Sequence, residues 1–278
     1  LWVEQQDRNQ IRDWHAVIDA KVYHYFDETP YWVQFDDDYS NKVMKAYLQD
    51  QITLGDLQLT LGVQQYLVDV ERTDNLNGRG HDKLNSDSDL LPSAGFVYQI
   101  SPELEVFAGY SQNFKAISDK PLEKKKAAQL TEIEPETADN LDLGLRYESG
   151  DVRASATVYK VKFDNRVALL TYQTKADGTP NYDAVGDGDY DNIGGVDSQG
   201  FEASLNWQLT DTLGVASTLT LNDSTYSDDV LGVATGADGK AANIIEYKEG
   251  EMIAGIPERM MTLGLNYQRD AYRAGINA

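Results

Sequence analysis

The segment Leu57–Gln64, which reads LQLTLGVQ, alternates apolar and polar residues along its whole length. Successive side chains of a β-strand point to opposite faces of a sheet, so one face of this segment is Leu, Leu, Leu and Val. The other face is Gln, Thr, Gly and Gln. The same alternation recurs at 141–147, 152–158, 203–207 and 261–267. A period of two over this many segments predicts antiparallel strands with one apolar face each.

The connections between these strands alternate between short and long. Tight turns are predicted near 55–56, 101–102, 149–151, 210–211 and 269–270. Long stretches rich in Asp, Asn, Gly and Ser lie between them, at 14–40, 70–92, 114–137, 171–196 and 224–255. In an up-and-down meander every second connection lies at the same end, so the tight turns share one rim. Outer-membrane barrels have this asymmetry, with short periplasmic turns and long extracellular loops.

Four predicted strands carry an aromatic residue shortly before their tight turn: Tyr98, Tyr147, Trp207 and Tyr267. Each aromatic continues the apolar face of its strand. Amphipathic rings at a common depth are typical of the boundary between lipid and water. The alternative is that Tyr and Trp are simply favourable strand residues near a sheet edge. We predict that these four residues contact outer-membrane lipid at its interface.

The composition agrees with a barrel and excludes other classes. The mean hydropathy of −0.51 remains compatible with a barrel, because a barrel strand shows lipid only at every second residue. The 278 residues contain no cysteine, which excludes a disulfide scaffold and a thiolate metal site. A net charge of −22 makes nucleic acid an unsuitable partner.

The predicted fold class is an all-β, antiparallel up-and-down transmembrane β-barrel of about eleven strands. Single-chain bacterial barrels close with an even number of strands, and an open sheet leaves unpaired edges in lipid. We therefore expect residues 1–278 to form part of a single barrel domain that is larger than this chain. A strand miscounted near the N-terminus is the alternative.

Several blocks resemble the barrel of TonB-dependent outer-membrane receptors. They are the strand pair at 91–98 and 101–115, the run EPETADN at 134–140, the run NIGGVDSQGFE at 192–202, and GIPER at 255–259. The blocks occur in the family's order and cover about residues 90–278, whereas residues 1–90 fit the preceding strands more loosely. Neither a plug domain, nor a TonB box, nor the last strands is recognised, and we expect all three to be absent from this chain.

The resemblance implies a bacterial outer-membrane barrel of twenty-two strands with an internal plug. It implies active uptake of a scarce nutrient, best an iron–siderophore complex, with energy delivered by TonB through the absent plug region. A passive porin or structural barrel is the main alternative. A secreted acidic β-sandwich that binds carbohydrate is another, but it gives no reason for loop lengths to segregate by end. In a barrel the lumen is lined by the polar alternates Gln58, Thr60, Asp142, Arg146, Ser204, Asn206 and Asn266.

The sequence offers little for catalysis. The three histidines, His15, His24 and His81, lie in or beside predicted loops and form no zinc-binding pair. No nucleophile elbow or phosphate-binding glycine loop is present in the sequence. We expect neither an enzyme nor a cofactor.

Two predicted loops, 171–196 and 224–255, are the candidates for capturing a small-molecule or metal-chelate ligand. The residues of the first loop that we expect to contact the ligand are Tyr172, Tyr182, Asp187, Asp189, Tyr190 and Asp191. The run Asp187–Asp191 has the alternating carboxylates that open an EF-hand, but Asn192 replaces the turn glycine and Ser198 the bidentate glutamate. Weak Ca²⁺ binding by Asp187, Asp189 and Asp191 and a merely solvated loop both remain open. An acidic mouth favours a neutral or cationic ligand.

Overall fold

The computed structural model describes residues 1–18, 21–23, 30–76, 80–124, 133–171, 188–192, 194–235 and 241–278. Its main sheet consists of β1 (Trp2–Trp14), β4 (Trp32–Leu54), β5 (Leu57–Asp74), β6 (Gly80–Asn85), β7 (Leu91–Ser101), β8 (Leu104–Lys115), β9 (Glu136–Ser149), β10 (Val152–Asp164), β13 (Val196–Thr210), β14 (Leu213–Tyr226), β17 (Arg259–Arg269) and β18 (Tyr272–Asn277). Separate two-stranded hairpins are formed by β2 (Ala16–Ile18) with β3 (Lys21–Tyr23), β11 (Val167–Thr171) with β12 (Gly188–Asn192), and β15 (Val230–Thr235) with β16 (Ala241–Tyr247). The helix α1 spans Lys120–Lys124. Within the described ranges, no helix is long and apolar enough to cross a membrane.

The main sheet is an antiparallel meander. Its strands pair in the order β1-β4-β5-β7-β8-β9-β10-β13-β14-β17-β18, and β6 pairs with β5 off this path. Of the twelve strands, eleven therefore lie on the path, as the sequence predicted. The sheet is not closed in this chain. The predicted fold class is confirmed, and the β-sandwich alternative is wrong.

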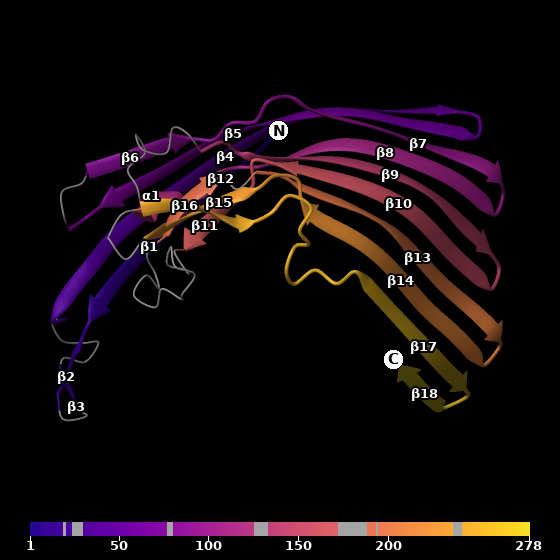
Figure 1. Cartoon of the computed structure of the whole chain (residues 1–278). Coiled ribbons are helices and arrows are strands. Elements are labelled where there is room, and N and C mark those ends of the chain that lie inside the picture. Colours follow the sequence, from indigo (N-terminus) through magenta and orange to yellow (C-terminus); the bar gives the residue numbers. More distant parts are fainter. Residues whose placement is uncertain are drawn as a thin grey trace. The chain divides into compact units, whose positions relative to one another are not determined.

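The five predicted tight turns each join two neighbouring strands of the sheet. They connect β4 to β5, β7 to β8, β9 to β10, β13 to β14 and β17 to β18. Three turn residues have positive φ: Gly55 at 60°, Gly150 at 45° and Asp270 at 50°. Two-residue hairpin turns favour such conformations, because they match the twist of the flanking strands. Figure 1 shows the turns along one rim of the sheet.

The long connections are more regular than the sequence predicted. β4 already begins at Trp32 inside the predicted loop 14–40, and β5 runs on to Asp74. The strand β12 and the β15–β16 hairpin lie inside the loops predicted at 171–196 and 224–255. The apolar alternation stops where the strands leave the apolar band, but pairing between backbone groups continues beyond it. A pattern based on apolar faces therefore ends each strand too early.

The chain divides into two compact units. Unit 1 contains Leu1–Ala46, Gln65–Asp89 and Ala116–Pro135, and unit 2 contains Tyr47–Gln64, Leu90–Lys115 and Glu136–Ala278. The buried apolar side chains of unit 1 include Tyr39, Val68, Val70, Leu84, Ile117, Leu122 and Ile133. Unit 2 has a small core of Val196, Tyr226 and Val230, against which Phe163, Tyr247 and Ile253 pack. The single barrel domain over residues 1–278 stays a prediction.

Candidate lumen and ligand-binding surfaces

The strands of unit 2 have two chemically different faces. On β9, the side chains of Leu141, Leu143 and Leu145 are 55%, 50% and 46% exposed, although all three are apolar. Asp142 and Arg146 alternate with them and point to the other face. An exposed apolar face is costly in water and favourable in lipid. The leucine face is therefore the lipid side of the sheet, and the polar face is the lumen side.

The four predicted interface aromatics all lie on the lipid side, next to the tight turns. Tyr98, Tyr147, Trp207 and Tyr267 are between 40% and 45% exposed. Their partners on neighbouring strands are apolar: Tyr98 lies opposite Leu57 and Val106, Tyr147 opposite Leu104 and Ala154, Trp207 opposite Val152 and Val215, and Tyr267 opposite Leu213 and Ala274. This position is the one that an aromatic girdle requires, and contact with lipid headgroups stays a prediction.

On the lumen side, an arginine is held between a carboxylate and an aromatic ring. Arg146 Nη1 lies 2.8 Å from Glu105 Oε1, on the neighbouring strand. Its guanidinium carbon lies 4.1 Å from the centre of the Phe107 ring, which is a cation–π contact. A Cβ atom at Gly144 would collide with this ring and with the carbonyl oxygen of Ala156. Glycine at 144 therefore allows Phe107 to lie flat across β9 beneath Arg146.

A second set of hydrogen bonds crosses β10, β13 and β14 on the same side. The Tyr159 hydroxyl donates to Asn222 Oδ1 at 2.7 Å, and the Ser198 hydroxyl donates to the same oxygen at 3.2 Å. Tyr159 reaches this partner by crossing Gly200, where a Cβ atom would collide with its ring. Farther toward the turns, the hydroxyls of Ser155 and Ser204 lie 2.7 Å apart. The lumen side is thus a hydrogen-bonded polar surface, which suits contact with water or a polar ligand.

Unit 1 contains a buried ion pair that the sequence reading missed. Arg72 Nη2 lies 2.8 Å and 2.9 Å from the two carboxylate oxygens of Asp37, and both side chains are 4% exposed. The Tyr39 hydroxyl donates to Asp37 at 3.2 Å. Arg8 lies with its guanidinium carbon 4.5 Å from the centre of the Tyr39 ring and forms a 2.6 Å ion pair with Asp119. The partners are 35 and 111 residues apart, so no local pattern could have revealed them.

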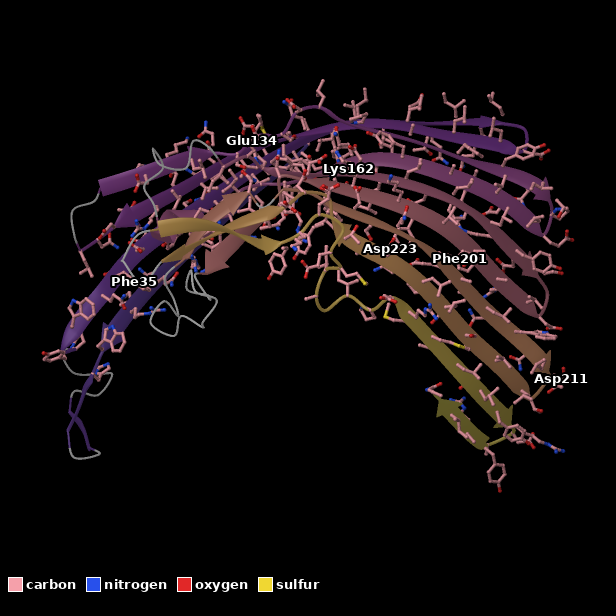
Figure 2. The ribbon with its side chains drawn as sticks, viewed as in Figure 1. Phe35, Glu134, Lys162, Phe201, Asp211 and Asp223 are labelled. Atoms are coloured by element: carbon pink, nitrogen blue, oxygen red, sulfur yellow. The ribbon has the colours of Figure 1, made fainter. Side chains whose placement is uncertain are left out.

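Beyond this cluster, β1 and β4 present aromatic rings beside an arginine. Trp14 and Trp32 are register partners, with ring centres 6.3 Å apart and planes at 22°. They remain 51% and 54% exposed. Two register pairs along, past a bulge in the strand, the guanidinium carbon of Arg12 lies 5.0 Å from the centre of the Phe35 ring. We call Arg12, Trp14, Trp32 and Phe35 the arginine–aromatic surface; Figure 2 labels Phe35 within it.

The predicted ligand loop is only partly described. Tyr172, Tyr182 and Asp187 lie outside the described residues. Asp189, Tyr190 and Asp191 belong to β12, where they pair with Leu170, Leu169 and Ala168 of β11. The structure thus places these three residues on a strand of a small hairpin instead of an irregular loop. Their contact with a ligand, and Ca²⁺ binding at Asp187, Asp189 and Asp191, stay predictions.

An antiparallel meander with a lipid side, a polar lumen side and tight turns on one rim defines a transmembrane β-barrel of the bacterial outer membrane. Residues 5–278 match the family model described as TonB dependent receptor-like, beta-barrel. The chain belongs to this family, whose members are receptors and transporters and not enzymes.

Similar proteins agree with this assignment. The chain is 23% identical over 237 residues to an uncharacterized TonB-dependent receptor of Haemophilus influenzae, which covers 81% of this chain and 58% of that protein. It is 25% identical over 220 residues to the metal-pseudopaline receptor CntO of Pseudomonas aeruginosa, covering 74% and 28%. The chain therefore spans less than two thirds of the length of either relative.

Solved structures show the same fold. The ferric citrate transporter FecA in its unliganded form superposes with a TM-score of 0.73 at 17% identity, over 99% of this chain and 37% of that one. The siderophore receptor PiuA of Acinetobacter baumannii superposes with a TM-score of 0.62 at 19% identity, over 86% and 33%. At these identities the likeness establishes the fold alone.

Proposed function

We propose that this protein is an outer-membrane active transporter that takes up a metal chelate, best an iron–siderophore complex, with energy delivered by TonB. Family membership is the observation that carries this proposal. Three similar proteins are described as a ferric citrate transporter, a siderophore receptor and a metal-pseudopaline receptor. The hydrogen-bonded polar face of unit 2 supports the proposal, because a polar solute needs a hydrophilic wall along its path.

The arginine–aromatic surface supports an anionic chelate with planar groups as the ligand. The Arg12 guanidinium attracts negative charge, and the exposed faces of Trp14 and Trp32 can stack on planar or aromatic groups. The acidic loop 171–196 led to the opposite expectation of a neutral or cationic ligand. We prefer the anionic chelate, because the arginine–aromatic surface combines charge and stacking groups at defined positions.

Uptake of radioactive iron–siderophore complexes by cells that carry or lack TonB tests the transport step. We expect saturable uptake in the presence of TonB and background uptake in its absence. A passive porin would instead give the same uptake in both strains, with a rate proportional to concentration. That result would exclude energy coupling.

Equilibrium binding of the iron–siderophore complex to the purified receptor tests the ligand surface. Trp32→Ala removes one stacking face, worth about 1 kcal/mol, so binding should weaken roughly fivefold. Arg12→Gln should weaken binding of an anionic chelate and leave that of a neutral chelate unchanged. Trp207→Ala, at the interface near a tight turn, is the matched control and should bind as the unaltered receptor does. Equal affinities for all three variants would refute the assignment of this surface.

A further inference from the structure

A groove opens on the lipid side of unit 2, where the edge of β14 loses its neighbouring strand. β17 pairs with β14 only as far as Arg259, which lies opposite Leu221. The chain preceding β17 touches β14 again at Met252, which forms an isolated bridge with Thr225. Between these two points the segment 253–258 is not a strand and contains Gly255, whose φ is +82°. The groove is a consequence of this detour.

The detour is fixed at both ends by backbone hydrogen bonds. The Asn222 amide donates to the carbonyl oxygen of Glu258 at 2.8 Å, and the Ile253 amide donates to that of Ser224 at 3.0 Å. These bonds satisfy the edge of β14 without a regular strand beside it. The backbone that borders the groove is therefore held in place at both ends of the detour.

The lining of the groove combines three kinds of groups. Phe201, Leu221 and Met252 supply its apolar surface, and Leu221 and Met252 are 40% and 41% exposed. Gln199, Asp223 and Glu258 supply amide and carboxylate groups, and Arg259 supplies a cation. The groove is open to the outside and has a volume of about 710 Å³. Figure 2 labels Phe201 and Asp223 on the neighbouring strands β13 and β14.

The groove lies near the edge of the apolar band that is far from the tight turns. Arg259 is eight residues (267 − 259) from Tyr267 on the same face of β17, so at about 3.4 Å per residue and a tilt near 40° it lies roughly 20 Å from the aromatic girdle, in a band about 25 Å tall. Val158, Phe201, Leu221 and Arg259 lie opposite one another across β10, β13, β14 and β17. The next outward-facing row, farther from the tight turns, is Lys160, Gln199 and Asp223. Beside the groove the lipid side thus changes from apolar to polar and charged within one row. Because the strands are tilted, Leu143, which lies opposite Val158 in the first of these rows, is nearer the middle of the band. Because tight turns are periplasmic in such barrels, this edge lies at the outer leaflet.

We propose that this groove is a binding site for a phosphorylated glycolipid of the outer leaflet. One acyl chain lies on Phe201, Leu221 and Met252, and a phosphate is bound by Arg259 at the band edge. Gln199, Asp223 and Glu258 accept or donate hydrogen bonds with sugar hydroxyls, which are the natural partners of amides and carboxylates. A simple anionic phospholipid fits less well, because its headgroup offers fewer hydroxyl groups to the two carboxylates beside Arg259 than the sugars of a glycolipid do.

In a membrane the acyl chain gains little from hydrophobicity, since it is surrounded by lipid before and after binding. Selectivity therefore depends on the headgroup and on the shape of the groove. Replacing Arg259 should therefore weaken lipid binding more than replacing any other residue of the groove. The site does not depend on the transported ligand, so the proposal of a lipid site remains valid even if the proposal of siderophore uptake fails.

Native mass spectrometry of the intact receptor tests the proposal. The receptor is purified from outer membranes, stripped of lipid in detergent and titrated with lipid A or with phosphatidylglycerol. We expect lipid A to bind and phosphatidylglycerol to bind at least several-fold more weakly. Arg259→Gln should weaken lipid A binding about tenfold, as for the loss of a hydrogen bond to a charged group. Leu221→Trp, which fills the apolar surface, should weaken it as well.

Two variants on the same face of β17 are matched controls. Arg269→Gln removes a charge at the turn end of the strand, and Leu265→Trp adds a ring at a position 43% exposed and outside the groove. Both should bind lipid A as the unaltered receptor does. Equal binding of the two lipids, equal weakening by Arg259→Gln and Arg269→Gln, or retention of detergent with no displacement by lipid A would each overturn the proposal. If Leu221→Trp does not fold, the comparison of Arg259→Gln with Arg269→Gln still tests the proposal.

Discussion

Replacing Leu143 by arginine places a charge on the leucine face of β9. Leu143 is 50% exposed and lies opposite Ala108 of β8 and Val158 of β10. It is four residues farther from the tight turn than Tyr147. At about 3.4 Å per residue and a tilt near 40°, these four residues place Leu143 roughly 10 Å deeper in the membrane than Tyr147.

An apolar band about 25 Å tall that starts near the aromatic girdle has its midplane close to this depth. Arginine there costs about 2–4 kcal/mol, whereas near the interface it costs about 0–1 kcal/mol. We therefore expect Leu143→Arg to lower the free energy of unfolding by about 2–4 kcal/mol and Tyr147→Arg by at most about 1 kcal/mol. Asp142→Arg, on the adjacent lumen-facing position, should have a small effect, because its side chain remains in a polar environment.

The assay is reversible unfolding of the intact receptor in denaturant in the presence of lipid vesicles, with barrel assembly followed by heat-modifiable migration on gels. Leu143→Arg and Tyr147→Arg differ in depth within the membrane, whereas Leu143→Arg and Asp142→Arg differ in the face of the strand. Comparing the three variants therefore tests the two assignments separately. A cost for Leu143→Arg no larger than that for Tyr147→Arg would refute the depth assignment. A cost for Asp142→Arg larger than that for Leu143→Arg would show that the two faces are reversed.

Other substitutions test the remaining contacts. Asp37→Asn leaves the Arg72 guanidinium buried without its counter-charge and should lower the free energy of unfolding by about 3–5 kcal/mol, measured as a lower unfolding midpoint. Recovery of stability when Arg72→Met is added would confirm that the unpaired charge is responsible. Gly144→Val forces a side chain into the neighbouring ring and carbonyl and should reduce assembled barrel severely, whereas Gly109→Ala, with open space around its Cβ position, should assemble normally. Trp207→Asp should destabilise by no more than about 1 kcal/mol if the ring lies at the interface, and a larger loss would place it deeper in the bilayer.

The sequence by itself determined the architecture of the sheet. Alternation over segments such as Leu57–Gln64 identified the strands and their two faces, because neighbouring side chains of a strand necessarily point in opposite directions. Turn residues such as Gly55 and Gly150 identified the tight turns, since few residues adopt positive φ. Both signals are local, so they can be read without knowing which strands lie side by side.

The reliance on local signals also explains where the prediction from sequence failed. The predicted strands stopped near the ends of the apolar band, whereas β4 and β5 extend well past it through polar and charged runs such as 36–38 and 71–74. Polar strand extensions carry no apolar period, so sequence alone treats them as loop. The candidate ligand residues were chosen from such a loop, and Asp189, Tyr190 and Asp191 proved to lie on a paired strand.

Tertiary structure decided every feature that depends on register between strands. The Asp37–Arg72 pair, the crossing of Gly200 by Tyr159, the Trp14–Trp32 stack and the groove beside Leu221 each join residues from different strands. Among the first three, the sequence separations range from 18 residues (32 − 14) for Trp14 and Trp32 to 41 residues (200 − 159) for Tyr159 and Gly200. A shift of one residue in pairing would move every partner to the opposite face. Composition and periodicity determine which side chains each strand places on each of its faces. Only the pairing of the strands determines which side chains contact one another.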